Sequence, residues 1–310
     1  MNLFFNVILI ICGLGLICLI IGWLIAERWH LYLPSSKKFI PWFTFNPKIA
    51  VKSLLTYIYH RWPKVIQGVL INVIHPYLNG PIKRYVREHY HGKVLTQELA
   101  EAVINLDHEI PLQDLGQHII PYSMARDLVL QLPLDIVAYE CGCRSSRPKH
   151  CEPTQVCMLI GKPFTDFALE HHPKHSKRLS REEAIQLLRD EHERGHVHSA
   201  FFKEDRMNRF YVICNCCTCC CGGLEAMVKY HNPMIASSGF VAHVDVNTCI
   251  ACGVCAESCP TGALTVHSEA VVEWEKCIGC GICVDRCTQG VIELLQDVRK
   301  GIPLNVADIK

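Results

Sequence analysis

Two copies of one cysteine pattern constrain this chain more than any other feature of its sequence. The segments CIACGVCAESCPTGAL at 249–264 and CIGCGICVDRCTQGVI at 277–292 both contain C-x2-C-x2-C-x3-C. Thiolates spaced two residues apart on a short loop can reach the same metal ion or cluster. The two loops therefore form an internal repeat, and their spacing predicts bound metal clusters.

The repeat resembles the signature of bacterial two-cluster ferredoxins, in which the fourth cysteine of each run ligates the other cluster. The resemblance implies a small α+β domain with two [4Fe-4S] clusters and short strands at FVAHVDV, ALTVHS and AVVEWE. The sequence departs from the pattern at Thr288, where ferredoxins have proline, but this change leaves the ligands intact. By this resemblance, Cys249, Cys252, Cys255 and Cys287 hold the first cluster, and Cys277, Cys280, Cys283 and Cys259 hold the second.

Ten further cysteines lie in two groups between residues 141 and 221. Their spacing allows several pairs to share a metal, yet the first group matches no standard zinc pattern. We expect one or two additional iron–sulfur clusters here, with zinc as an alternative, and the spacing leaves the grouping open. The ten are Cys141, Cys143, Cys151 and Cys157 in the first group, and Cys214, Cys216, Cys217, Cys219, Cys220 and Cys221 in the second.

Both groups follow predicted strands, DIVAYE at 135–140 and RFYVICN at 209–215, so their loops could meet at one end of a sheet. The pattern predicts helices that begin at Thr96, within 121–132, and at Ser180. Glu183 completes a capping box with Ser180, and Gly195 is the expected end of that helix.

Charged residues near the cysteines allow two interpretations. Arg144 and Arg147 could donate hydrogen bonds to cluster sulfides, or they could be solvated side chains. The three histidines and the carboxylates of 190–198 could bind a metal, but the pattern favours a solvated helix face with a basic last turn.

An apolar N-terminal segment sets the predicted location. Residues 3–26 contain no charged side chain, and a helix of this length would cross a hydrocarbon core of ~30 Å. No lysine or arginine precedes the segment and no small-residue cleavage site follows it, which argues against a signal peptide. Basic residues follow at Arg28, Lys37 and Lys38, so the positive-inside rule places the rest of the chain in the cytoplasm. We expect a single-pass anchor in the cytoplasmic membrane with soluble domains facing the cytoplasm, where metal ligation is favoured over disulfides.

Residues 31–92 are rich in aromatic and basic side chains, and four of the five tryptophans fall before residue 63. This composition is typical of an interfacial segment, which could contact the membrane, a quinone or a partner subunit. Ordinary amphipathic helices packed on the core are the alternative.

The predicted fold class is α+β, with a transmembrane anchor at 1–30, an amphipathic membrane-proximal segment at 31–92, a cysteine-rich domain at 93–235 and a ferredoxin domain at 236–310. The 31 Lys+Arg against 30 Asp+Glu give no electrostatic support for a nucleic-acid partner. Phosphate-binding glycine loops and dinucleotide or flavin motifs are absent from the sequence.

The sequence predicts a protein that relays single electrons, with redox partner proteins or a catalytic subunit of an oxidoreductase complex as its partners. The wider combination of ECGCR, VCMLIG and ICNCCTCCCG with the terminal repeat resembles cysteine-rich 4Fe-4S-binding proteins of anaerobic microbes, and implies only electron transfer. Two alternatives remain: a reductase with an open-site cluster at 214–221, and soft-metal binding or transfer by the vicinal thiols of that run.

Overall fold

The computed structural model describes residues 15–39 without 16, 19 and 26, then 47–77, 90–106, 134–203, and 209–304 without 233. The chain divides into two compact units, residues 1–57 and 58–310. The finer predicted boundaries, at 30, 92 and 235, stay predictions.

The first unit is helical in its described residues. Residues 20–25 and 27–31 are helical, and α2 (Pro34–Phe39) and the first part of α3 (Pro47–Arg61) follow. Tyr57 is buried and donates a hydrogen bond of 2.9 Å to the buried carboxylate of Glu27. This pair anchors α3 to the helical residues that precede α2.

The main departure from the expected fold concerns the predicted transmembrane helix. Among the described residues, none of the helices is both long enough and apolar enough to cross a membrane. The predicted anchor at 1–30 was therefore wrong for the residues that the structure describes, and residues 1–14 lie outside them. The expected localisation and quinone contact stay predictions.

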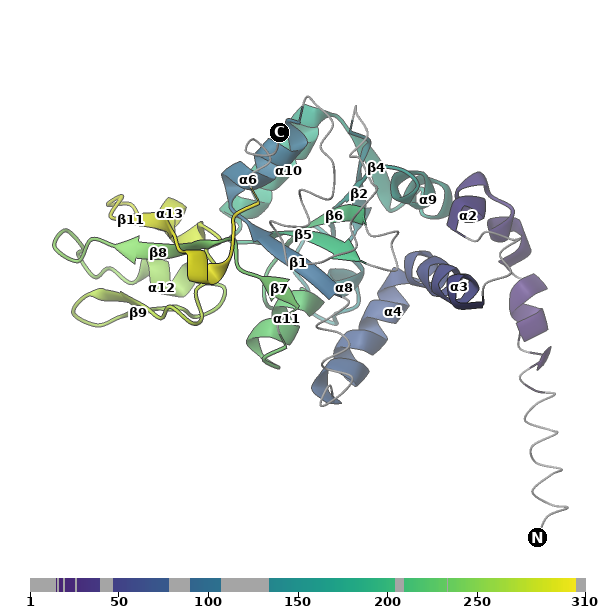
Figure 1. Ribbon diagram of the computed structural model, residues 1–310, viewed down its shortest axis with the longest axis horizontal. Helices are drawn as coiled ribbons and strands as arrows, with labels where there is room; N and C mark the ends of the chain where they lie inside the picture. Colours follow the sequence, from purple (N-terminus) through teal and green to yellow (C-terminus); the bar gives the residue numbers. More distant parts are fainter. Residues whose placement is uncertain are drawn as a thin grey trace, which may run out of the picture. The chain divides into compact units, whose positions relative to one another are not determined.

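The second unit is built on a seven-stranded sheet with the order β4-β2-β3-β6-β5-β1-β7 (Figure 1). Neighbouring strands are antiparallel, except for the parallel pair β1 and β7. Because β2 and β6 are both antiparallel to β3, they run in the same direction and finish at the same end of the sheet. The strands are β1 (Tyr90–Leu95), β2 (Ile136–Glu140), β3 (Gln155–Ile160), β4 (Ser176–Leu179), β5 (Val197–Lys203), β6 (Arg209–Cys216) and β7 (Ile235–Ala236).

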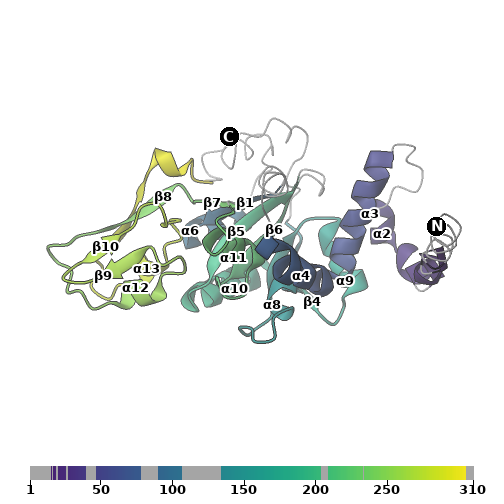
Figure 2. The ribbon, with the colours of Figure 1, turned by 90° about the horizontal axis from the view of Figure 1, so that it is seen from below.

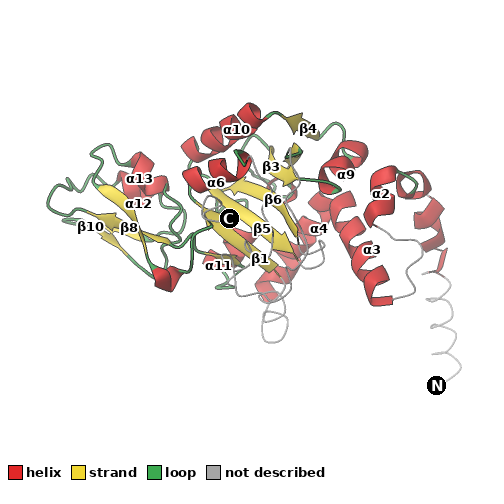
Figure 3. Cartoon of the chain, turned by 45° about the horizontal axis from the view of Figure 1, so that its top comes forward, coloured by secondary structure: helices red, strands yellow, loops and turns green. Residues whose placement is uncertain are grey.

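Helices flank this sheet, and α6 lies beside α10 over one of its faces (Figures 1 and 3). Side chains on a strand alternate between faces, so Met158 and Ile160 of β3 enter the core beneath these two helices. Cys157 and Leu159 face the opposite side, toward a pocket. The helices are α4 (Pro63–Val69), which continues as a π-helical turn (Leu70–Ile74) and a 3-10 turn (His75–Tyr77), α6 (Gln97–Ile104), α8 (Gly142–Ser145), α9 (Phe164–His171), α10 (Arg181–Glu193) and α11 (Gly222–Val228).

Local sequence signals explain where two of the predicted helices, α6 and α10, begin. Thr96 accepts a hydrogen bond of 3.3 Å from the Leu99 amide at the start of α6. Ser180 and Glu183 make both hydrogen bonds of the capping box at the start of α10. These predictions are confirmed, as are the strands before each cysteine group. The helix predicted within 121–132 lies outside the described residues.

The C-terminal module is a small α+β arrangement with two cysteine loops. Strand β8 (Phe240–Val244) pairs with β11 (Ile292–Gln296), and β9 (Leu264–Val266) pairs with β10 (Ala270–Val272). Each cysteine loop leads into a short helix, α12 (Val254–Ser258) or α13 (Ile282–Arg286), and these two helices lie side by side (Figure 2). The strands expected from the ferredoxin resemblance are therefore present.

Candidate metal centres

The eight cysteines of the C-terminal module surround two small cavities, and each cavity takes cysteines from both repeats. This is the crossed grouping that the resemblance implies. Four thiols around one cavity are the donor set of a [4Fe-4S] cluster, so the residues fit that group. Ligation of iron by these thiols stays a prediction. The cavities are lined by Cys249, Cys252, Cys255 and Cys287, and by Cys259, Cys277, Cys280 and Cys283.

A backbone amide and an obligatory glycine shape the second of these sites. The Ala242 amide donates a hydrogen bond of 3.5 Å to the Cys277 thiol. Gly279 has a φ of +64°, and a Cβ at this position would lie 2.3 Å from the Phe240 carbonyl oxygen. Only glycine fits here, because any side chain would push β8 away from the cysteine loop.

The two sites differ in their exposure. Cys252 of the first site is exposed, and its neighbours Ile250 and Val254 are 63% and 39% exposed. In the second site, Cys277 and Cys283 are buried. Burial raises the pKa of the Cys283 thiol, because desolvation disfavours the thiolate. The first site is therefore the more exposed of the two, although its Cys255 is buried as well.

The ten cysteines of the middle region meet because β2 and β6 finish at the same end of the sheet. Four of them form what we name the outer quartet: Cys151, from the loop between β2 and β3, and Cys217, Cys219 and Cys220, which follow β6. All four sulfur atoms lie within 4.8 Å of one another. The sequence alone did not show that these four cysteines form one group, because Cys151 and Cys217 are 66 positions apart.

The other six cysteines line a separate pocket, and we name them the inner six. None of the outer quartet lines this pocket. Burial and neighbouring thiols perturb the pKa of several of them. For example, hydrogen bonding with Cys141 is the largest cause of a Cys216 thiol pKa well above its ordinary value. The inner six are Cys141, Cys143, Cys157, Cys214, Cys216 and Cys221.

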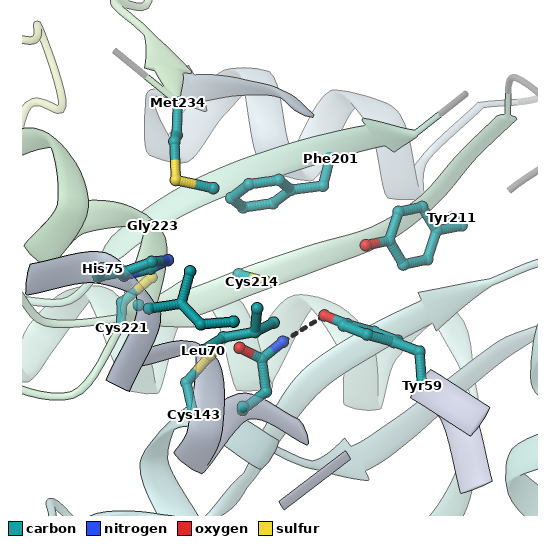
Figure 4. A pocket seen from close by; sticks show the side chains of 13 residues that line it. Tyr59, Leu70, His75, Cys143, Phe201, Tyr211, Cys214, Cys221, Gly223 and Met234 are labelled. Atoms are coloured by element: carbon teal, nitrogen blue, oxygen red, sulfur yellow. Dashed lines mark hydrogen bonds between the residues drawn. The ribbon is translucent and has the colours of Figure 1, made fainter. Parts of the chain in front are cut away.

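A neighbouring cavity extends from the inner six toward α4 and the turns that follow it. Figure 4 shows Cys143, Cys214 and Cys221 along it, opposite aromatic side chains that include Tyr59. Its volume is about 110 Å³, and it is partly open to solvent. His75 lines this cavity, is only 7% exposed, and has no hydrogen-bond partner for its Nδ1 atom among the described residues. Burial lowers the pKa of His75, so its imidazole is neutral at pH 7.

A buried charge network contacts both cysteine groups. Arg144 is fully buried, and its guanidinium donates hydrogen bonds to Glu191 at 3.2 Å and to the Asn215 carbonyl oxygen at 3.1 Å. His196 lies 2.6 Å from the same Glu191 carboxylate. Although burial opposes its charge, hydrogen bonding with Cys217 and Glu191 raises the pKa of His196 to about 8. The network thus places two cations against thiols, which offsets thiolate charge.

This network corrects two sequence interpretations. Arg144 is not solvated, and its buried Nε has no partner among the described residues, so it remains available as a donor. Arg147 instead pairs with Glu225. The histidines of 190–198 are buried rather than exposed to solvent. A signal existed: Glu191 and His192 follow Ala184 by seven and eight positions, which places them on the same buried helix face.

Comparisons with known proteins agree with the geometry of the C-terminal module. The family model of the 4Fe-4S binding domain matches residues 242–265 and 270–293. A search of curated proteins found no match to the chain. The C-terminal module is a two-cluster ferredoxin-like domain, and its match together with the cysteine-rich region indicates an iron–sulfur electron-transfer protein.

Proposed function

We propose that the chain relays single electrons from a redox partner, through the two clusters of the C-terminal module, to a further centre held by the inner six cysteines. The observation that carries the proposal is the pair of four-cysteine cavities, each completed by the other repeat. Clusters so linked lie close together in a single small module, which suits electron transfer without acid–base chemistry. We also propose that the whole chain is similar to cysteine-rich 4Fe-4S-binding proteins and that it works as a subunit of a redox complex.

Exposure of the first site supports its role as the entry point. Ile250 and Val254 place exposed apolar side chains beside Cys252. An apolar contact surrounding a cluster lets a partner protein exclude water and approach the cluster closely. A partner subunit or soluble donor would dock here.

Contacts between α13 and α10 support onward transfer from the second site. Asp285 follows Cys283 on α13 and lies 2.5 Å from His192 on α10. The neighbouring Arg286 also donates a hydrogen bond to the carbonyl oxygen of Glu193 at the end of α10. Because α10 also carries Glu191, the same helix contacts the second cluster loop and the network beside the inner six.

The proposal is tested on full-length protein purified without oxygen. Iron, zinc and acid-labile sulfide are counted per chain, and rapid photochemical reduction is followed by electron paramagnetic resonance. We expect about eight irons and eight sulfides from the C-terminal module and further metal from the middle region. The middle centre should accept electrons after the ferredoxin clusters.

Matched variants identify the route. Cys280→Ala removes a thiol of the second site, and Cys252→Ala removes one from the first. We expect Cys280→Ala to slow reduction of the middle centre more than tenfold when electrons enter through the first cluster. Equal rates in the wild type and Cys280→Ala would exclude the proposed route, and a chain without sulfide would exclude the function.

A second candidate function is reduction of a small molecule at the inner six. The cavity beside Cys143, Cys214 and Cys221, with the neutral His75 on its wall, favours it because a bound molecule could reach a cluster there. Adding cyanide to the reduced protein should change the spectrum of an open-site centre. A fully thiolate-ligated relay centre would keep its spectrum.

A further inference from the structure

The outer quartet has dimensions that discriminate between two kinds of metal site. The Cys151 sulfur lies 3.7 Å from that of Cys217 and 3.5 Å from that of Cys219. The sulfurs of Cys219 and Cys220 are 3.7 Å apart, and every pair in the quartet is within 4.8 Å.

These separations match a single metal ion. Four sulfurs at about 2.3 Å from one tetrahedral ion are about 3.8 Å from each other. A [4Fe-4S] cluster places four irons and four sulfides between its ligands, and holds the thiolate sulfurs roughly 6 Å apart. The outer quartet is too compact for a cubane.

The quartet adjoins the inner six through the Cys216 thiol, which hydrogen-bonds with Cys217 and Cys220, but none of the quartet lines the pocket of the inner six. Cys216 and Cys217 are adjacent in sequence, but only Cys216 lines the pocket of the inner six. Cys216 is buried, whereas Cys217 is partly exposed and Cys219 is exposed. The quartet reaches the surface through Cys219, although its Cys220 is buried.

Neighbouring groups suit bound thiolates in the outer quartet. The Cys151 amide donates a hydrogen bond of 3.5 Å to the Cys220 sulfur. The His196 side chain hydrogen-bonds with the Cys217 thiol, and its Nδ1 atom lies 2.6 Å from the Glu191 carboxylate. Hydrogen bonds of this kind orient metal ligands and stabilise their negative charge.

We infer that Cys151, Cys217, Cys219 and Cys220 bind one mononuclear tetrahedral ion, zinc or iron, at a site separate from the centre of the inner six. This site is additional to the proposed electron relay and does not depend on it. Zinc would make it a structural cross-link of the two cysteine loops, and iron would make it a one-electron centre.

The test compares the metal and sulfide contents of full-length variants purified without oxygen. The double variant Cys151→Ser/Cys219→Ser removes two ligands from different loops. Thr218→Ala is the matched control, since it changes the same loop but removes no thiol. We expect the double variant to lose about one metal ion per chain with its sulfide unchanged, and the control to lose neither.

The identity of the lost ion distinguishes zinc from iron. Loss of about four irons together with four sulfides would overturn the inference in favour of a cluster, and retention of all metal would overturn it as well. If the double variant fails to fold, the wild type is measured instead. Where zinc is bound, X-ray absorption at the zinc edge should show four sulfur neighbours at about 2.3 Å, and any other ligand set overturns the inference. Where iron exceeds sulfide, Mössbauer spectroscopy should show one iron with four thiolate ligands outside the clusters, and a spectrum that assigns every iron to clusters overturns it.

Discussion

Substituting Gly279 tests whether the second cluster site depends on close contact between β8 and the cysteine loop. An alanine Cβ at this position would lie 2.3 Å from both the Phe240 carbonyl oxygen and the Ser238 hydroxyl. The left-handed backbone conformation costs alanine about 1–2 kcal/mol. Moving β8 to relieve the overlap costs about 1–3 kcal/mol more.

The displacement also affects two hydrogen bonds at this contact. The Ser238 hydroxyl donates to the Gly279 carbonyl at 2.7 Å, and the Ser238 amide donates to the Ile278 carbonyl at 3.0 Å. Their loss adds about 0.5–1.5 kcal/mol each. We therefore expect Gly279→Ala to destabilise the module by about 3–8 kcal/mol in total.

Gly262 offers a matched control, because its φ is +62° but a Cβ there meets nothing within 4 Å. Gly262→Ala should cost only the conformational part, about 1–2 kcal/mol. Iron and sulfide counts and guanidinium unfolding, both without oxygen, measure the two variants. We expect Gly279→Ala to lose about four irons and four sulfides and Gly262→Ala to keep them. Equal retention by both variants would refute the steric argument.

Two further predictions concern buried charges. Burial lowers the pKa of Lys93 from 10.5 to about 8. Between pH 8 and 10.5 the unfolded chain therefore holds a proton that the folded chain has released, so the free energy of unfolding rises with pH in that window. Lys93→Met should therefore raise the free energy of unfolding at pH 7 by up to about 3 kcal/mol and remove most of its increase between pH 8 and 10.5. Equal urea-unfolding profiles for the wild type and Lys93→Met from pH 7 to 10.5 would contradict this. Arg144→Met should cost about 3 kcal/mol, because it removes the buried guanidinium from the Glu191 carboxylate, which keeps only Arg194 and His196 as partners. Adding Glu191→Leu should recover part of this loss in the same urea assay, whereas purely additive losses would show that the pair is not coupled.

Local signals in the sequence predicted the elements that bring the cysteines together. Thr96 and Ser180 mark helix starts because their side chains accept hydrogen bonds from amides in the first turn. The apolar strands before Cys141 and Cys214 were equally readable, since their side chains pack on both faces of a sheet. The doubled cysteine spacing predicted the C-terminal module.

Long-range relations could not be read in the same way. The outer quartet joins Cys151 to cysteines 66 or more positions later, and which thiols meet depends on where β3 places the loop. The helix pattern places Glu191 on a buried face and leaves the position of Arg144 open, and only the tertiary fold makes the two side chains partners. The apolar run at 3–26 predicted a transmembrane anchor, but none of the described helices is both long and apolar enough to cross a membrane.

The shared direction of β2 and β6 has a consequence for how the protein is made. Cys151 leaves the ribosome 66 residues before Cys217, which at 5–20 residues per second is a delay of roughly 3–13 s. During this interval the earlier thiols have no completed site and can be oxidised or captured by an unintended metal. Once the later loop is made, an ion bound at the proposed site cross-links the two loops. A cross-link of that span lowers the conformational entropy of the unfolded state and so stabilises the folded protein by about 4 kcal/mol. Loading of the proposed site is therefore a late step of synthesis, and it requires that the earlier thiols stay reduced while the chain is completed.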